Sequence, residues 1–333
     1  METFRGKTVL VTGSSGHLGE AICRSLLNVE SEIIGVDVLQ SEFTTHVGTI
    51  LDRAFLKEML QGVECVFHTA TLHKPHIESH NNQDFVDINV TGTLNMLEES
   101  VAAGIKSFIF TSSTTVFGDA MKAASPVWVT EELQPIPKNI YGVTKFAAEN
   151  LCEMFYRIHG LPCLVLRTSR FFLELDDDPK MLGIYADENI KCQEYLYRRV
   201  DVEDVVSAHL LAAIKCADIG FGKYIISATT LFHQEDIPSL QDKADEVLAK
   251  RCPEYPDIYQ SLGWKMFTRF DRVYDNSKAR RDLNWQPVHD FSSAVRMAAQ
   301  EMPMQSALAS LVGVKGYHRS KKNLHSRLES LSI

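Results

Sequence analysis

The stretch Thr8-Val-Leu-Val-Thr-Gly-Ser-Ser-Gly-His-Leu-Gly19 decides the fold of this chain. Its first five residues are β-branched or apolar and are typical of a buried strand. Three glycines follow at the start of a segment with helical periodicity. One allows a turn with positive φ, one lets backbone approach a pyrophosphate, and one lets the helix pack on the sheet. The free N–H groups of this helix start favour phosphate, so a dinucleotide is predicted to bind at Gly13, Gly16, His17, Leu18 and Gly19.

Strand and helix alternate along the first half of the chain. Strand-like runs recur at Glu32–Asp37, Cys65–His68, Ser107–Thr111 and Cys163–Arg167, with helical segments at about 17–29, 52–61, 84–103 and 142–159. This order predicts an α/β doubly wound parallel sheet, the Rossmann fold. Asp37 ends the second strand, where a carboxylate would accept hydrogen bonds from the adenosine ribose and repel a 2′-phosphate. The cofactor expected is therefore NAD.

The alternation changes after residue 168. We expect an NAD-binding domain over 1–168, completed by about 201–230, and a smaller substrate-binding domain made of 169–200 and 231–300. Within the first, Val202–Ala212 is predicted to be a helix and Lys223–Ser227 a strand of the sheet. Residues 301–333 are expected to be a C-terminal extension, and Asp176-Asp-Asp178 a solvated loop.

Bulk composition narrows the function. The 333 residues carry a formal net charge of −9, which argues against a general nucleic-acid binder. No apolar run approaches the ~20 residues needed to span a membrane. Seven scattered cysteines without a Cys-x-x-Cys motif indicate reduced thiols and a cytoplasmic protein. The partner expected is a small-molecule substrate, with neither nucleic acid nor membrane.

A tyrosine and a lysine lie four residues apart in Tyr141-Gly-Val-Thr-Lys145. On a helix they share a face, and an ammonium beside a phenol favours phenolate and lowers the tyrosine pKa. The pair is weak evidence alone, because the spacing is common. Together with the glycine-rich turn it predicts a proton-transfer site beside the dinucleotide.

Further motifs carry a family resemblance. They are Phe67-His-Thr-Ala70, Asn89-Val-Thr-Gly-Thr93, Thr111-Ser-Ser-Thr-Thr-Val-Phe-Gly118, Asp201-Val-Glu-Asp204 and Asp275-Asn-Ser-Lys-Ala279 with Leu283-Asn-Trp285. In this order the chain resembles, over roughly 7–290, the extended short-chain dehydrogenase/reductase family and its NAD-dependent epimerase/dehydratase branch. The resemblance implies that Ser113, Tyr141 and Lys145 are catalytic. It adds cofactor contacts, with Tyr141 and Lys145 among them, at Thr49, Ile50, Thr69, Ala70, Thr71, Asn89 and Ser169.

The implied mechanism is hydride chemistry at a carbinol. Ser113 and Tyr141 would hydrogen-bond the reacting hydroxyl, and Tyr141 would remove its proton as hydride passes to the nicotinamide. Lys145 would lower the pKa of Tyr141 and hold the nicotinamide ribose. Ser112 or Thr114 is an alternative to Ser113 as the hydroxyl partner.

The chain departs from the family pattern at positions that concern the substrate and the adenine. Thr114 replaces the acidic residue of dehydratases, so elimination is disfavoured. Arg170 replaces an asparagine that contacts nucleotide sugars, and Thr49 stands at the usual acidic position on the adenine side. His73 falls where epimerases often have lysine. Substrate contacts are expected from His73, Thr115, Arg170, Arg198 and Arg199.

Two groups of residues near these positions, one basic and one of histidines, each have two possible interpretations. Arg170, Arg198 and Arg199 with Lys74 would bind an anion, or else form a charged helix face. His73 or His76 would contact substrate, or else the histidines at 73, 76 and 80 are ordinary loop residues. No metal is expected, because the family chemistry needs none.

The function predicted is an NAD-dependent epimerase acting on a sugar or nucleotide sugar through a transient keto intermediate. The alternatives are a net dehydrogenase of a sugar, sugar acid or related alcohol, and a non-catalytic cofactor-binding regulator. The resemblance also implies a homodimer, formed by helices near 90–103 and 145–159. An apolar face compatible with that contact comes from Phe146, Leu151, Met154, Phe155 and Ile158, which would equally suit packing on the sheet.

Overall fold

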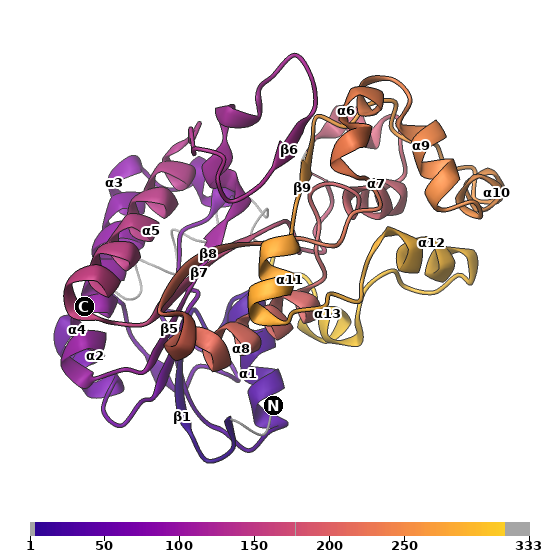
Figure 1. Ribbon diagram of the computed structural model, residues 1–333. Coiled ribbons are helices and arrows are strands. Elements are labelled where there is room, and N and C mark those ends of the chain that lie inside the picture. Colours follow the sequence, from indigo (N-terminus) through magenta and orange to yellow (C-terminus); the bar gives the residue numbers. More distant parts are fainter. Residues whose placement is uncertain (1–3, 177, 317–333) are drawn as a thin grey trace.

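A seven-stranded parallel sheet forms the centre of the molecule (Figure 1). The computed structural model describes residues 4–176 and 178–316. The strand order is β3–β2–β1–β4–β5–β7–β8, which reverses direction between β1 and β4 as a doubly wound sheet requires. This confirms the predicted Rossmann fold. The strands are β1 Thr8–Thr12, β2 Glu32–Asp37, β3 His46–Val47, β4 Cys65–His68, β5 Ser107–Ser113, β7 Cys163–Thr168 and β8 Phe221–Ile226.

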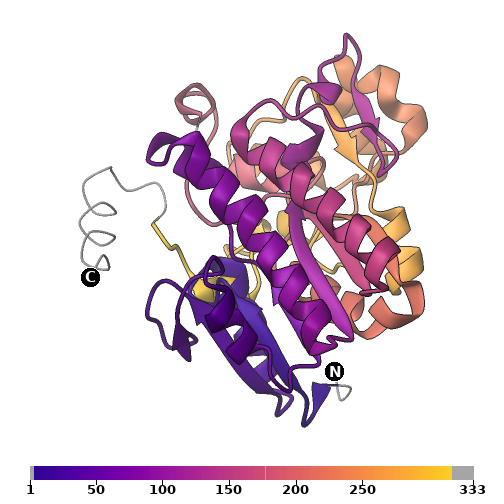
Figure 2. The same ribbon diagram turned by 90° about the vertical axis from the view of Figure 1, so that its left-hand side faces the viewer.

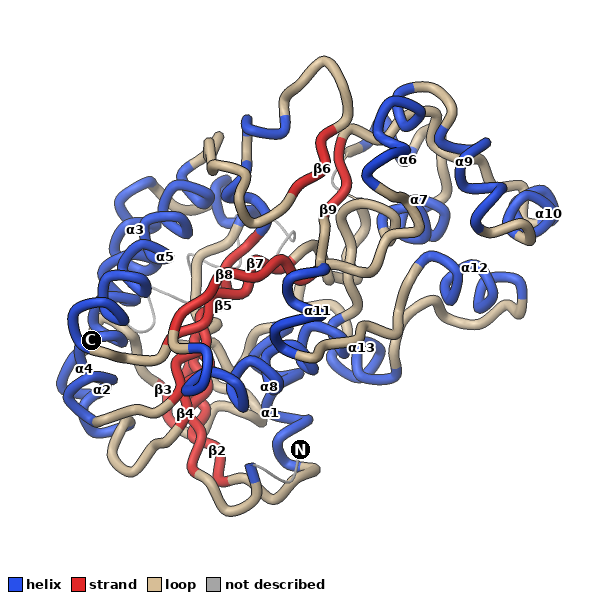
Figure 3. Tube along the Cα trace, viewed as in Figure 1, coloured by secondary structure: helices blue, strands red, loops and turns tan. Residues whose placement is uncertain are grey.

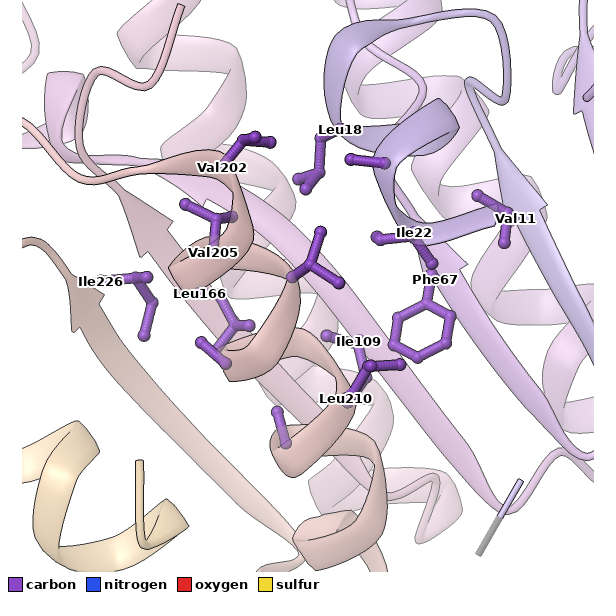
Figure 4. Close-up of a cluster of buried hydrophobic side chains, with 14 of the residues drawn as sticks. Val11, Leu18, Ile22, Phe67, Ile109, Leu166, Val202, Val205, Leu210 and Ile226 are labelled. Atoms are coloured by element: carbon purple, nitrogen blue, oxygen red, sulfur yellow. The ribbon is translucent and has the colours of Figure 1, made fainter. Parts of the chain in front are cut away.

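Helices cover both faces of this sheet (Figure 3). On one face, α1 (His17–Leu27) and α8 (Val202–Ile219) enclose an apolar core. Figure 4 shows that Val11, Phe67 and Leu166 of the strands meet Ile22 and Val205 of these helices. The other face is covered by α2 (Arg53–Met59), α4 (Gly92–Ala103) and α5 (Ile140–His159), with a second core.

Two helices differ from their predicted bounds. The segment expected as one helix over 84–103 begins with α3 (Asn82–Val86), continues as a π-helical turn at Asp87–Thr91, and becomes α4 at Gly92. The helix predicted from 202 to 212 continues to Ile219, because its apolar positions keep contacting the sheet. The periodicity of apolar residues predicted where these helices lie. It did not predict the π-helical turn at Asp87–Thr91, which depends on packing.

The apolar face of α5 is mostly used inside the molecule. Leu151, Met154 and Phe155 pack into the core beneath the sheet, and Phe146 packs against a small cluster around Val116 and Tyr274. Of the five residues considered for a dimer face, Ile158 alone remains exposed, at 65%. The structure therefore assigns most of this face to covering the sheet.

A separate hydrophobic core lies beyond the sheet, at the upper right of Figure 1. It is built by α7 (Asp187–Glu194), α9 (Ala244–Arg251), α10 (Tyr255–Ser261) and α12 (Phe291–Ala299). The short elements of this region are α6 Pro179–Leu182 and the 3₁₀ helix Gln234–Gln241. A two-stranded sheet pairs β6 (Val127–Val129) with β9 (Arg272–Tyr274).

Part of the sequence expected in the smaller domain packs instead with the sheet. Helix α11 (Ser277–Leu283) contacts α8 and β8, and the fully buried Trp285 donates its indole N–H to Asp204 O at 3.0 Å. The reason is the apolar surface of α8, which Trp285 covers. The division into domains otherwise stays a prediction.

The described part of the C-terminal extension returns to the first helix. Helix α13 (Ala307–Val312) contacts α1 and α8. All seven cysteines are buried free thiols. Within 4–176 and 178–316, none of the helices combines the length and apolar character that crossing a bilayer requires.

Candidate active site

A cleft of about 1800 Å³ runs across the carboxyl ends of the strands. Three predicted site residues, Asn89, Lys145 and Arg199, do not line it and are almost completely buried. The other predicted residues do line it: Gly13, Gly16, His17, Leu18, Gly19, Asp37, Thr49, Ile50, Thr69, Ala70, Thr71, His73, Ser113, Thr115, Tyr141, Ser169, Arg170 and Arg198.

One end of the cleft, the dinucleotide end (Gly13–Gly19 and Asp37), is shaped by glycine. Gly13 has φ +72°, and a Cβ there would lie 2.8 Å from Ala70 N. A Cβ on Gly19 would lie 2.0 Å from Gly13 O, so the close crossing of loop and helix excludes any side chain. Helix α1 starts at His17 without a side-chain cap, which leaves its first N–H groups available to a phosphate. These residues fit a dinucleotide.

Asp37 is held at the end of β2 by backbone donors. Its Oδ2 accepts from Ser15 N at 3.0 Å and its Oδ1 from Leu39 N at 2.9 Å. Each oxygen keeps a further lone pair for a ribose hydroxyl. The carboxylate thus lies beside the glycine-rich loop, oriented before any ligand binds.

Ser113 and Tyr141 meet in the middle of the cleft. Ser113 is the last residue of β5, and its Oγ accepts from Thr115 N at 3.1 Å. Tyr141 lies in the first turn of α5, where Asn139 caps the helix by accepting from Gly142 N at 2.9 Å. The Ser113 side chain acts on the Tyr141 phenol and lowers its pKa. The Ser113 and Tyr141 hydroxyl groups therefore lie in the same part of the cleft.

The expected effect of Lys145 on Tyr141 is not found. Burial raises the pKa of Tyr141 to about 12, although the hydrogen bond with Ser113 lowers it. Burial also lowers the pKa of Lys145 to about 7, with Cys152 and Glu149 opposing that shift. The ammonium lies 4.1 Å from the centroid of the Phe110 ring. Desolvation is the largest cause of both shifts, and neither group is among the causes of the other's shift.

A buried ionic group that the sequence analysis missed supports these residues. Glu149, one turn after Lys145, accepts from Ser112 Oγ at 2.6 Å and pairs with Arg167 at 2.8 Å. Both charged side chains are at most 2% exposed. The network ties α5 to β5 and β7 directly behind Ser113. The signal was available, because a glutamate at this helical spacing on a buried face needs a partner.

Asn89, predicted to contact the cofactor, instead braces the cleft wall. Its Oδ1 accepts from Leu72 N at 2.8 Å, and its Nδ2 donates to Thr144 Oγ1 at 3.0 Å. It lies on the π-helical turn, buried to 2% exposure. Asn89 thereby fixes the loop after β4 against α5, and its direct contact with the cofactor stays a prediction.

The opposite end of the cleft, the arginine end (Arg170, Arg198 and Arg272), is rich in charge. Arg170 and Arg198 pair with Asp176 at 3.1 and 3.2 Å, and Arg198 also pairs with Glu194 at 2.7 Å. Asp176, expected in a solvated loop, is 7% exposed because it joins these two guanidinium groups. Burial opposes ionisation of Glu194, but the arginines around it, Arg199 foremost, outweigh this and lower its pKa.

Arg199 faces away from the cleft. Its guanidinium pairs with Glu194 at 2.6 Å and donates to Phe172 O at 2.9 Å, and the side chain is 4% exposed. Arg199 is absent from the lining of the cleft, and its predicted contact with the substrate stays a prediction. Arg272, which the sequence analysis did not select, lines the cleft in its place.

The histidine loop forms a short aromatic stack on one wall of the cleft. The rings of His73 and His76 have centroids 4.3 Å apart, and those of His76 and His80 lie 5.3 Å apart. His73 also stacks on Phe172 at 5.7 Å. The described residues contain no group of three or more histidine, cysteine or acidic side chains that could hold a metal ion.

Comparison with known proteins places this geometry in a family. Residues 9–226 match the NAD dependent epimerase/dehydratase family. A UDP-glucose 4-epimerase of Rhizobium leguminosarum bv. trifolii is 30% identical, over 88% of this chain and 96% of that protein. An uncharacterized protein, y4nG of Sinorhizobium fredii, is 35% identical over 48% of this chain. The match spans 40% of the length of y4nG.

A solved structure extends the likeness to the whole fold. The crystal structure of the UDP-glucose 4-epimerase of Thermotoga maritima with UDP-glucose has a TM-score of 0.61 at 23% identity. The alignment covers 88% of this chain and 97% of that one. At this identity the likeness concerns the fold.

Proposed function

Because this chain belongs to the NAD dependent epimerase/dehydratase family, its cofactor is NAD, and we propose that it is an epimerase of a sugar or nucleotide sugar acting through a transient keto intermediate. The observation that carries the proposal is the meeting of Ser113 and Tyr141 in the cleft that also contains the glycine cradle. A hydroxyl pair beside a dinucleotide site suits proton removal coupled to hydride loss.

The residues of the chain divide the chemistry between them. Ser113 Oγ and Tyr141 Oη hydrogen-bond the reacting hydroxyl, and the Tyr141 phenolate takes the proton from its oxygen. NAD, when bound, would supply the hydride acceptor and donor for this chemistry. Lys145 adds positive charge behind the site when protonated, below its pKa of about 7. The phenolate is scarce at neutral pH because the pKa of Tyr141 is about 12, so turnover is expected to rise with pH.

The arginine end supports a substrate that carries an anionic group. The Nε atoms of Arg198 and Arg272 are buried and have no hydrogen-bond partner among the described residues. Both guanidinium groups lie over the Tyr197 ring, at 5.3 and 5.6 Å. Unsatisfied donors at the cleft wall favour a phosphate or carboxylate, which guanidinium binds with strong charge-assisted bonds. The diphosphate of a nucleotide sugar meets this requirement.

The position after Ser113 argues against dehydration. Thr114 is 7% exposed and its hydroxyl points to Thr168 O at 3.5 Å, so no acidic group stands there to assist elimination. Arg170, which stands in place of an asparagine, is paired with Asp176. Its substitution therefore favours neither an epimerase nor a net dehydrogenase.

A screen of purified protein tests the proposal. Free sugars, sugar phosphates and UDP-sugars are incubated with NAD, while NADH absorbance and epimer formation are followed together. An epimerase gives an epimer without NADH accumulating. NADH released in proportion to substrate would replace the proposal with a net dehydrogenase. NAD binding without either reaction would favour the non-catalytic regulator.

A homodimer belongs to the same proposal. Val143 and Ile158 on α5 are exposed, at 48% and 65%, and are available for a contact between two copies. Light scattering on the full chain tests it, and a monomeric mass would remove the dimer without affecting the proposed reaction.

A further inference from the structure

The last described residues of the chain reach the dinucleotide end of the cleft. Helix α13 is anchored by Ser306, whose Oγ donates to Asp201 Oδ1 at 2.6 Å and whose N donates to Asp201 Oδ2 at 2.9 Å. After α13 the chain turns at Gly313, with φ +64°. Figure 2 shows this yellow end of the chain beside the indigo N-terminal part. Val314, Lys315 and Gly316 then line the cleft.

Lys315 makes two contacts at the start of α1. Its Nζ forms an ion pair with Glu20, which lies in the first turn of that helix, and its backbone N donates to Glu174 Oε1 at 3.3 Å. Glu20 also pairs with Arg24 at 2.8 Å. The side chain of Glu20 is 8% exposed, so its charge is screened mainly by these two cations.

Glu174 joins three segments that are far apart in sequence. It lies in the connection after β7, and its Oε1 is 3.2 Å from Nε2 of His17, the first residue of α1. Burial disfavours its charge, but His17 outweighs burial and holds the pKa of Glu174 at about 2. Gly313 and Val312 share a small cavity with His17. Glu174 is therefore a carboxylate at neutral pH, fixed between the helix start and the C-terminal segment.

Two buried carboxylates thus lie beside the start of α1, behind the residues that line the cleft. Negative charge beside the uncapped start of α1 repels a pyrophosphate bound there. Lys315 offsets Glu20, and His17 contacts Glu174. The C-terminal segment consequently decides how favourable this helix start is for an anion.

We propose that Gly313–Gly316 is part of the cofactor site, a C-terminal strap in which Lys315 offsets the charge of Glu20, clamps onto Glu174 and so holds NAD at the start of α1. The strap deepens the proposed function and rests on its NAD site. An epimerase must keep the reduced cofactor while the keto intermediate turns, and a strap at the phosphate end slows its loss. Glu174 and Lys315 are positioning residues, acting through the helix start.

The test is the dissociation constant of NAD and the release rate of NADH, measured on the full chain without substrate. Lys315→Met is expected to raise the dissociation constant of NAD about tenfold and to speed NADH release, because a charge-assisted contact is lost. Lys315→Arg keeps the charge and is expected to stay near wild type. Lys243→Met, at an exposed lysine remote from the cleft, is the matched control.

A double variant separates charge from structure. Adding Glu20→Gln to Lys315→Met removes the carboxylate that Lys315 offsets and is expected to restore most of the NAD affinity. Unchanged affinity in Lys315→Met would overturn the strap, and so would a double variant as weak as the single one. Failure of the wild-type chain to bind NAD would instead overturn the proposed function, so the two failures are distinguishable.

Discussion

The dinucleotide end of the cleft is made largely of backbone, whereas the arginine end is made of long charged side chains. At the first, the glycines leave room that a Cβ would fill, and α1 begins without a side-chain cap. At the second, Arg170 and Arg198 are held by Asp176 and Glu194. The dinucleotide end is therefore formed by residues adjacent in sequence, whereas the arginine end depends on ion pairs between residues further apart along the chain.

The largest expected effect lies between the two ends. Tyr141→Phe removes the phenolic oxygen and is expected to lower turnover by about 10³-fold, since general base catalysis is lost. NAD affinity should change little, because the glycine cradle is untouched. Turnover and NAD titration are compared with Tyr156→Phe, on the same helix. Near-normal turnover in Tyr141→Phe would remove this residue from the mechanism.

A methyl group added at Gly19 should reduce NAD binding at the dinucleotide end and leave the arginine end unchanged. In Gly19→Ala the new Cβ would lie 2.0 Å from Gly13 O, so loop and helix must separate. NAD affinity is expected to fall roughly 100-fold or more, about 3 kcal/mol, as the phosphate contacts are lost. Calorimetry measures it beside Gly183→Ala, where a Cβ meets nothing closer than 3.5 Å. Equal affinity in the two variants would show that the close crossing does not matter for the cofactor.

The arginine end can be weakened without touching the cofactor. Arg272→Met keeps the length of the side chain and removes a donor whose Nε has no described partner. KM for an anionic substrate is expected to rise about tenfold, while NAD affinity stays unchanged. Arg281→Met, at an arginine 68% exposed, is the control. A loss of NAD affinity in Arg272→Met would contradict the separation of the two ends.

The free energy of unfolding should fall in acid, because two histidines, His68 and His209, are buried in the sheet region. Burial lowers the pKa of His68 to about 3 and of His209 to about 4, from 6.5. Between these values and 6.5 the unfolded chain binds more protons, so stability falls as pH drops below 6.5, by about 1.4 kcal/mol per pH unit for each histidine. Glu194 at the arginine end has a lowered pKa, so its ion pairs persist further into acid.

Urea unfolding at about pH 7.5 and about pH 5 measures this dependence. His209→Gln should have a shallower slope, because one of the two groups is gone. The same slope in both proteins would assign the acid sensitivity to other residues.

Local patterns were enough for much of the fold and the cofactor end. The run Thr8–Gly19 located β1, the turn and α1, because strand, glycine spacing and helix start are set by neighbouring residues. Asp37 was predicted to contact the cofactor because it ends the strand that follows the glycine-rich turn and its helix. NAD and the Rossmann fold were predicted correctly on that basis, and Tyr141 reaches the cleft because α5 begins beside it.

The pKa values and the charged contacts were decided by tertiary structure. No spacing reveals that Tyr141 and Lys145 are both desolvated, since burial depends on elements that pack from elsewhere. Asp176 was expected in solvent and instead pairs with two arginines.

Local sequence patterns were sufficient to predict the sheet, the helix that starts at the glycines, and the two hydroxyl residues Ser113 and Tyr141. Only tertiary structure decided which arginines face the cleft and that Lys315 reaches α1. Backbone conformation depends mainly on residues close in sequence. Burial and electrostatic interactions depend also on residues that are distant in sequence and that the fold brings into contact.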